Sequence, residues 1–102
     1  MSDAAHSLRE RLVWRYEVKP EAIGAFEAAY GPGGDWDQFF NGAPGYERTE
    51  FYRCVGSPNV YITVDYWSGS GQRDLFVASR RPQYDTIDAR CEQFTVDELR
   101  LV

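Results

Sequence analysis

Two charged residues stand inside segments that otherwise have the pattern of β-strands. Asp65 lies in the alternating run from Val60 to Trp67, and Arg48 lies in the alternating run from Tyr46 to Cys54. Aspartate is disfavoured within strands and costly to bury alone, so Asp65 should have a partner. An aspartate with a shifted pKa can act as a base, and a nearby arginine can stabilise the anion that forms.

The turn between the two runs predicts which residues face each other. A four-residue loop, Val55 to Pro58, makes the runs a hairpin and places Arg48 opposite Asp65. The other pairs on that side would be Tyr46 with Trp67, Glu50 with Thr63, and Tyr52 with Tyr61, and the reverse side would carry Phe51, Ile62 and Val64. The plainer interpretation of Arg48 and Asp65 is a cross-strand ion pair that only supports the sheet.

Aromatic residues are the second feature that could serve chemistry. They make up 16% of the chain, enough to fill a core but also to line a cavity for a flat organic ligand. Tyr46 opposite Trp67 would form an aromatic wall. Trp36 and Tyr30 could close the cavity mouth, with Gly31 to Gly34 either a mobile lid or an ordinary loop.

Tyr84 is a further candidate, in the second half of the chain. Its phenol could orient a substrate oxygen if the helix that carries it overlooks the sheet. Its spacing from Ile87 and Cys91 is equally typical of a helix face packed into the core. Both interpretations stay open at this point.

The elements that must position these residues follow from periodicity and turn signals. The pattern predicts a strand at Arg11–Val18, a helix at Pro20–Tyr30 broken by Gly31 to Gly34, a short helical piece after Asp35, the hairpin, a long helical region from about Ser70, and a strand at Val96–Val102. Asp35 with Gln38 suggests a capping box, and Pro82 suggests a kink or a break in the second helical region.

This order of elements predicts an α+β, ferredoxin-like βαββαβ fold. Its antiparallel four-stranded sheet would carry the helices on one face. The two faces of the predicted hairpin both carry large apolar side chains, so neither suits exposure to water. We therefore expect a homodimer that buries the open sheet face across a two-fold axis.

Composition limits the classes of partner. The chain has 102 residues, a formal net charge of −5 and a pI near 4.7, which argues against nucleic acid and anionic membranes. Residues 1–10 contain no apolar run and are expected to be a flexible tail, before a single domain at 11–102. No stretch approaches the roughly 20 apolar residues of a membrane span.

The sequence lacks the residues that several kinds of catalytic or cofactor site need. The one histidine, His6, falls in the expected tail, so no Ser-His-Asp set can form. Cys54 and Cys91 are isolated, which indicates neither a disulfide framework nor a metal cluster and fits a reducing cytoplasm. The glycine run at 31–34 lacks the lysine of a nucleotide loop. We expect no metal, flavin or nucleotide.

The chain resembles the antibiotic biosynthesis monooxygenase family over roughly residues 11–102. The resemblance rests on the run Trp14 to Val18, the helix Pro20 to Tyr30, Gly34-Asp35-Trp36, Pro44-Gly45-Tyr46, and Asp65-Tyr66-Trp67-Ser68 followed by Phe76. It implies a dimeric α+β barrel and assigns Trp67 to the pocket, and the alternative is that the indole simply fills the barrel interior. Some members oxygenate aromatic polyketide hydroquinones without metal or flavin, and related small proteins degrade haem.

The resemblance implies a cofactor-independent monooxygenase that oxidises a hydrophobic aromatic molecule. In that case Asp65, Arg48, Tyr84 and Trp67 would be catalytic, and the substrate would lie among Tyr46, Trp36, Phe76 and Tyr30. A ligand-binding domain without turnover and a purely structural dimer are the alternatives.

The sequence departs from the family pattern at two places, and one of them bears on the activity. The haem-degrading relatives place a histidine where this chain has Gln83-Tyr84-Asp85, which argues against haem. Ser68 to Gly71 also replaces the Glu-Ser that the family usually shows after the tryptophan.

Overall fold

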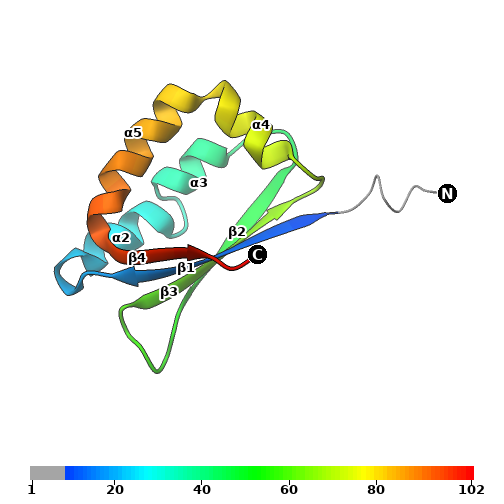
Figure 1. Ribbon diagram of the computed structural model, residues 1–102. Helices are drawn as coiled ribbons and strands as arrows, with labels where there is room; N and C mark the ends of the chain where they lie inside the picture. Colours follow the sequence, from blue (N-terminus) through cyan, green and yellow to red (C-terminus); the bar gives the residue numbers. More distant parts are fainter. Residues whose placement is uncertain (1–8) are drawn as a thin grey trace.

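The computed structural model describes residues 9–102 as one sheet with a layer of helices (Figure 1). The elements are β1 (Glu10–Val18), η1 (Pro20–Ala22), α2 (Ile23–Tyr30), α3 (Asp35–Phe40), β2 (Tyr46–Arg53), β3 (Val60–Trp67), α4 (Gln72–Ser79), α5 (Arg81–Cys91), η2 (Glu92–Phe94) and β4 (Thr95–Arg100). His6 and most of the expected tail lie outside the described residues.

The sheet has the strand order β2-β3-β1-β4, and every neighbouring pair is antiparallel. The helices lie over one face of it, as Figure 1 shows, and none of the elements within residues 9–102 covers the reverse face. The predicted α+β, ferredoxin-like βαββαβ fold is therefore confirmed. No helix within residues 9–102 is both long and apolar enough to cross a bilayer.

A β-bulge near the start of β2 changes the predicted hairpin register. Tyr46 pairs with Trp67 as expected, but the register then shifts, so Arg48 pairs with Tyr66 and Thr49 with Asp65. An extra residue on one strand moves every following side chain to the other face. The hairpin loop also has five residues, Val55 to Asn59, instead of the predicted four, because the Cys54 amide donates to the Val60 carbonyl (2.9 Å). The predicted pairing of Arg48 with Asp65 is wrong for these reasons, as are the pairs Glu50 with Thr63 and Tyr52 with Tyr61.

The same shift exchanges two neighbouring aromatic residues between the faces. Phe51 stacks on Tyr61, with ring centroids 5.4 Å apart, and also meets Phe26 of α2 under the helices. Tyr52 instead lies 51% exposed on the reverse face, where Ile62 and Val64 also point. The expectation that Phe51 shares a face with these two β-branched residues is wrong.

The break between α2 and α3 comes from a close approach of backbone. A Cβ on Gly34 would lie 2.3 Å from the carbonyl oxygen of Ala28, so only glycine fits there. The predicted capping box does not form. Asp37 instead accepts a hydrogen bond from the Gly33 amide (2.8 Å), and the Gln38 amide nitrogen donates to the Gly33 carbonyl (2.8 Å).

The second helical region is also two helices, and they part before the proline. α4 ends at Ser79 and α5 begins at Arg81, so Pro82 lies in the first turn of α5. A first turn has no intrahelical acceptor for its amides and therefore tolerates the missing N–H of proline. Of the two predicted outcomes, a kink or a break, the structure has the break, and the proline lies at the start of the new helix.

The helix-covered face of the sheet holds two neighbouring clusters of buried side chains. One lies under α2 and contains Tyr16, Val18, Phe26 and Tyr61. The other lies under α3 and α4 and contains Leu12, Phe40, Ala43, Trp67, Phe76 and Val77. A polar region lies beside them, and it forms the site described next.

Candidate functional site

A cavity of about 50 Å³ lies between the sheet and the helices. Its walls come from all four strands and from α2, α3, α4 and α5. The residues that line it are Trp14, Tyr16, Tyr30, Trp36, Asp37, Phe40, Thr49, Thr63, Asp65, Arg73, Tyr84, Asp88 and Glu98. Aromatic rings thus surround a group of charged and hydroxyl side chains in the interior.

Asp65 lies at the sheet side of this cavity. The Thr49 hydroxyl of β2 donates a hydrogen bond to Asp65 Oδ1 at 2.7 Å. Burial raises the pKa of Asp65 above its usual value, against the opposing effects of the Thr49 hydrogen bond and the Arg73 charge. A raised pKa brings a carboxyl group closer to the range in which it can exchange protons at neutral pH.

Two further groups continue the polar contacts away from Asp65. The Tyr46 hydroxyl lies 2.8 Å from Thr49 Oγ1 and donates to Asp37 Oδ1 of α3 at 3.2 Å. Burial is the main cause that raises the pKa of Tyr46, to about 12. Its phenol therefore keeps its proton at neutral pH.

Arg73 brings a positive charge to the cavity from α4. Its side chain is only 15% exposed, and its buried Nε has no hydrogen-bond partner. The guanidinium lies about 6 Å from the ring centres of three aromatic residues, Trp14, Phe40 and Tyr84. A cation with an unused donor inside an aromatic wall can stabilise an anion formed there.

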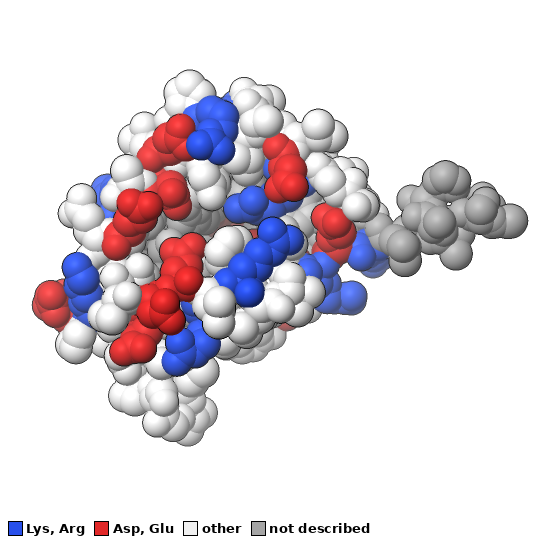
Figure 2. Space-filling model, in the orientation of Figure 1, with Lys and Arg blue, Asp and Glu red and all other residues white. Residues whose placement is uncertain are grey.

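The remaining polar groups make the opposite side of the cavity acidic. Asp88 of α5 and Glu98 of β4 both line it, and burial is the main cause that raises the pKa of each. Figure 2 shows a hollow between α5 and β4, with acidic residues on both of its sides and basic residues at one end. The cavity thus approaches the surface at an edge of strong charge.

The aromatic wall includes one more unused donor. The indole Nε1 of Trp36 is buried without a hydrogen-bond partner, and the Trp36 ring lies 5.3 Å from that of Tyr84. Burial also raises the pKa values of Tyr16 and Tyr30, so both phenols stay neutral. Buried polar atoms usually have partners, so two unpartnered donors at one cavity point to a ligand with acceptor atoms.

Four of the residues singled out from the sequence meet at this cavity. They are Asp65, Tyr84, Trp36 and Tyr30. Tyr46 joins them through the Thr49 hydroxyl. Trp67 and Phe76 are not among the lining residues, and Trp67 is 1% exposed with its ring packed on Phe40 and Tyr46.

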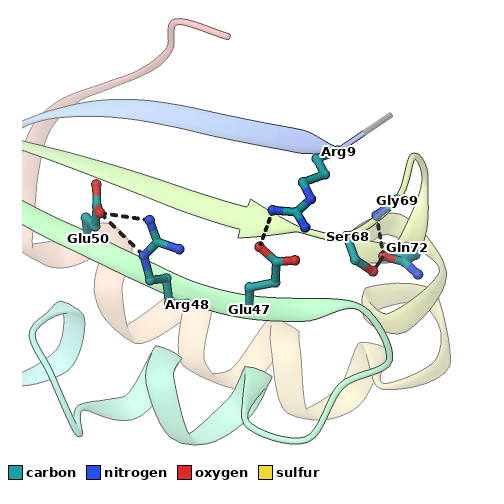
Figure 3. A network of polar contacts seen from close by, with 7 residues as sticks. All are labelled: Arg9, Glu47, Arg48, Glu50, Ser68, Gly69 and Gln72. Atoms are coloured by element: carbon teal, nitrogen blue, oxygen red, sulfur yellow. Dashed lines mark hydrogen bonds and ion pairs between the residues drawn. The ribbon is translucent and has the colours of Figure 1, made fainter. Parts of the chain in front are cut away.

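Arg48 lies on the reverse face of the sheet, away from the cavity. Its guanidinium forms an ion pair with Glu50 (3.2 Å) and lies over the ring of Tyr66 (3.8 Å), as the close view of Figure 3 shows for the ion pair. The Tyr66 hydrogen bond is the first cause that lowers the pKa of Glu50. Arg48 therefore belongs to a surface cluster, and Arg73 supplies the positive charge beside Asp65.

Sequence reasoning missed several cavity residues, among them Thr49, Thr63, Arg73, Asp37, Asp88 and Glu98. The inward direction of Thr49 depends on the β-bulge, which the amino-acid sequence does not indicate. Thr63 could have been found, because it lies two residues before Asp65 and so on the same face of a strand. Arg73 stands in an ordinary helical pattern that does not reveal its inward direction.

Within residues 9–102, no three histidine, cysteine or acidic side chains are arranged to hold a metal ion. A scan against known protein families finds no match, and a search of curated proteins finds none either.

Solved structures do match this chain closely in shape. SnoaB, a cofactor-independent oxygenase from Streptomyces nogalater, matches with a TM-score of 0.74 and 18% sequence identity over 92% of this chain and 91% of that one. The chain has the fold of the antibiotic biosynthesis monooxygenases.

Two other structures with this monooxygenase fold agree. A putative antibiotic biosynthesis monooxygenase from Nitrosomonas europaea matches with a TM-score of 0.73 and 12% identity, over 94% of this chain and 88% of that one. A conserved protein from Methanosarcina mazei Go1 matches with a TM-score of 0.74 and 16% identity, over 92% and 91%. Identities this low establish the fold alone.

Proposed function

We propose that this protein is a cofactor-independent oxygenase that acts on a hydrophobic aromatic molecule of the hydroquinone type. The observation that carries the proposal is Asp65, a buried carboxyl group with a raised pKa inside an aromatic-walled cavity. The shared fold with SnoaB, which is described as a cofactor-independent oxygenase, supports it. The unpartnered donors of Arg73 and Trp36 could donate hydrogen bonds to the oxygen atoms of such a ligand.

The reaction needs only the substrate and O2 to balance. One hydroquinone and one O2 give one hydroxyquinone and one water, and the ring supplies all the electrons that O2 accepts. Ionised Asp65 takes a phenolic proton, which leaves an electron-rich anion that can react with O2. Arg73 stabilises this anion, and the aromatic wall keeps water away from it.

The small size of the cavity favours a second candidate function, that of a structural domain without a ligand. Its volume of about 50 Å³ is well below the roughly 300 Å³ at which ligand pockets begin. A structural domain would have such a closed interior, but it would also be expected to fill that interior with apolar side chains. The oxygenase proposal therefore requires side chains of the aromatic wall to move aside when substrate enters.

Oxygen uptake with a panel of hydroquinones, in metal-free buffer, tests the proposal. Asp65→Asn should reduce the rate by at least about 100-fold, the lower range for removing a general base. Val55→Ala is the matched control, because Val55 is fully exposed in the hairpin loop and should leave the rate unchanged. Hydroquinone binding without oxygen uptake in the wild type would favour a ligand-binding domain. The absence of both binding and uptake would favour a structural domain.

We also propose that the protein is a cytoplasmic homodimer joined through the reverse face of the sheet. That face carries Val13, Ile62, Val64 and Leu99. Arginine and glutamate side chains on the same face, including Arg48 and Glu50, give a two-fold partner both signs of charge.

Sedimentation measures this assembly directly. Ile62→Lys should convert the dimer to a monomer by placing a charge in the interface, whereas Val55→Lys should not. A wild-type protein that sediments as a monomer at high concentration would contradict the proposal.

A further inference from the structure

Four side chains form a continuous line from the cavity to the surface. Asp65 Oδ1 contacts Thr49 Oγ1 (2.7 Å), Thr49 Oγ1 contacts the Tyr46 hydroxyl (2.8 Å), and that hydroxyl contacts Asp37 Oδ1 (3.2 Å). Every step is within hydrogen-bond distance. Asp37, Tyr46 and Thr49 also line a surface groove of about 390 Å³ between α3 and β2. Asp37 and Thr49 line both spaces, so the line leads from Asp65 to a carboxyl group that stands between the interior cavity and a second, more open space.

The number of protons in this line is informative. Two hydroxyl groups supply one proton each, but the three contacts need three. If both carboxyl groups are ionised, Thr49 donates to Asp65 and Tyr46 donates to Asp37. The contact between Tyr46 and Thr49 then joins two oxygen atoms with no proton between them. A third proton on one of the carboxyl groups completes the line.

The third proton can lie at either end. If Asp65 carries it, Asp65 donates to Thr49, Thr49 donates to Tyr46, and Tyr46 donates to Asp37. If Asp37 carries it, each of the three hydrogen bonds is reversed. The two arrangements use the same oxygen positions and differ by a one-step shift of three protons.

The surroundings of the two ends of the line differ. Asp37 Oδ2 accepts a hydrogen bond from the Gly33 amide (2.8 Å), and its Oδ1 is the end of the line. Burial raises the pKa of Asp65. The other charged or titratable groups around the cavity are Arg73 of α4, Asp88 and Tyr84 of α5, Glu98 of β4, Tyr16 of β1 and Tyr30 of α2.

We propose that Thr49 and Tyr46 form a proton relay that carries a proton between Asp65 in the cavity and Asp37 in the surface groove. The relay deepens the proposed oxygenase function, on which it rests for the origin of the proton. A proton taken from the substrate by Asp65 moves to Thr49 as the Thr49 proton moves to Tyr46 and the Tyr46 proton moves to Asp37. Asp37 then releases its proton to water, and Asp65 is ionised again.

The exchange of the Asp65 proton with deuterium tests the relay without any substrate. Infrared spectroscopy resolves the carbonyl band of a protonated carboxyl group, and Asp65→Asn identifies the band that belongs to Asp65. The wild-type band should appear as the pH falls from neutral towards about 4, the ordinary carboxyl pKa, and should shift rapidly on mixing with D2O. Thr49→Val should slow that shift at least about tenfold, whereas Thr49→Ser should keep it within about twofold.

Tyr46→Phe is a second interruption at another point, and it should slow the exchange as Thr49→Val does. It keeps the experiment decisive if the valine variant does not fold. Equal exchange rates in the wild type and Tyr46→Phe would overturn the relay, as would the absence of any Asp65 band over this pH range. Oxygen uptake in the same variants separates the two proposals, because a protein without turnover can still show the relay in its exchange rates.

Discussion

Two regions under the same helical layer differ sharply in chemistry. Under α2, Val18, Phe26 and Tyr61 are at most 1% exposed and pack ring against ring. Beneath α3, α4 and α5, the same face of the sheet carries Thr49, Asp65 and other polar groups that line the cavity. This sheet face thus has an apolar end under α2 and, beside it, the polar part that lines the cavity, which we call the polar end, although the apolar cluster of Leu12, Trp67 and Phe76 lies beyond it.

The comparison shows where stability and function separate. Burial of polar groups opposes folding, whereas an apolar end gains free energy from every side chain it buries. A core selected for stability alone would fill the space of the cavity with apolar side chains as well. The polar end therefore indicates a site, and the apolar end is the part of the fold that offsets its cost.

Phe26→Ala should produce the largest change in stability, because it removes a fully buried ring from the apolar end. The free energy of unfolding should fall by about 3–5 kcal/mol. Urea denaturation measures the loss. A decrease below about 1 kcal/mol would show that the apolar end is not the stabilising region.

Asp65→Asn tests the polar end, where we expect an effect on activity and not on stability. Thr49 can still donate to the amide oxygen of asparagine, so the fold should be retained, while oxygen uptake falls by at least about 100-fold. Urea denaturation and oxygen uptake on one preparation separate the two effects. A large loss of stability at all pH values with intact uptake would assign Asp65 a structural role.

The stability of Asp65→Asn relative to the wild type should depend on pH. Burial raises the pKa of Asp65 in the folded state above the 3.8 of a free aspartate, so the folded state holds its proton more tightly. This contribution is fully present below the unfolded pKa and is lost as pH rises through the folded pKa. The variant should therefore gain on the wild type across that interval, measured by urea midpoints at several pH values. Parallel curves would contradict the raised pKa.

Arg48→Ala should have the smallest effect. Its ion pair with Glu50 lies on the surface, where such pairs contribute up to about 1 kcal/mol. Oxygen uptake should stay within about twofold of the wild type, because the guanidinium does not reach the cavity. A loss of oxygen uptake as large as that of Asp65→Asn would show that Arg48 takes part in the reaction. Arg73→Gln is the informative partner variant, and it should reduce uptake strongly.

The sequence predicted the fold through features that are local and periodic. Alternation marked the four strands, and the glycine run at 31–34 marked the break in the first helical region. Asp65 was identifiable because an acidic residue inside a strand pattern needs a reason. The identity of its neighbours was not predictable, because a single bulge beside Glu47 moved Arg48 out of the cavity and Thr49 into it. Arg73 was missed because helical periodicity does not show which polar residue turns inward.

The three tryptophans provide the most direct test of the polar end as a ligand site. Trp14 and Trp36 line the cavity, whereas Trp67 is buried in the adjacent core and is not in its lining. Titration with a hydroquinone under anaerobic conditions, followed by the indole N–H resonances, should shift Trp36 most and Trp14 next, and leave Trp67 nearly unchanged. Equal shifts of all three signals, or no shift at saturating hydroquinone, would contradict a ligand site at the polar end of the sheet.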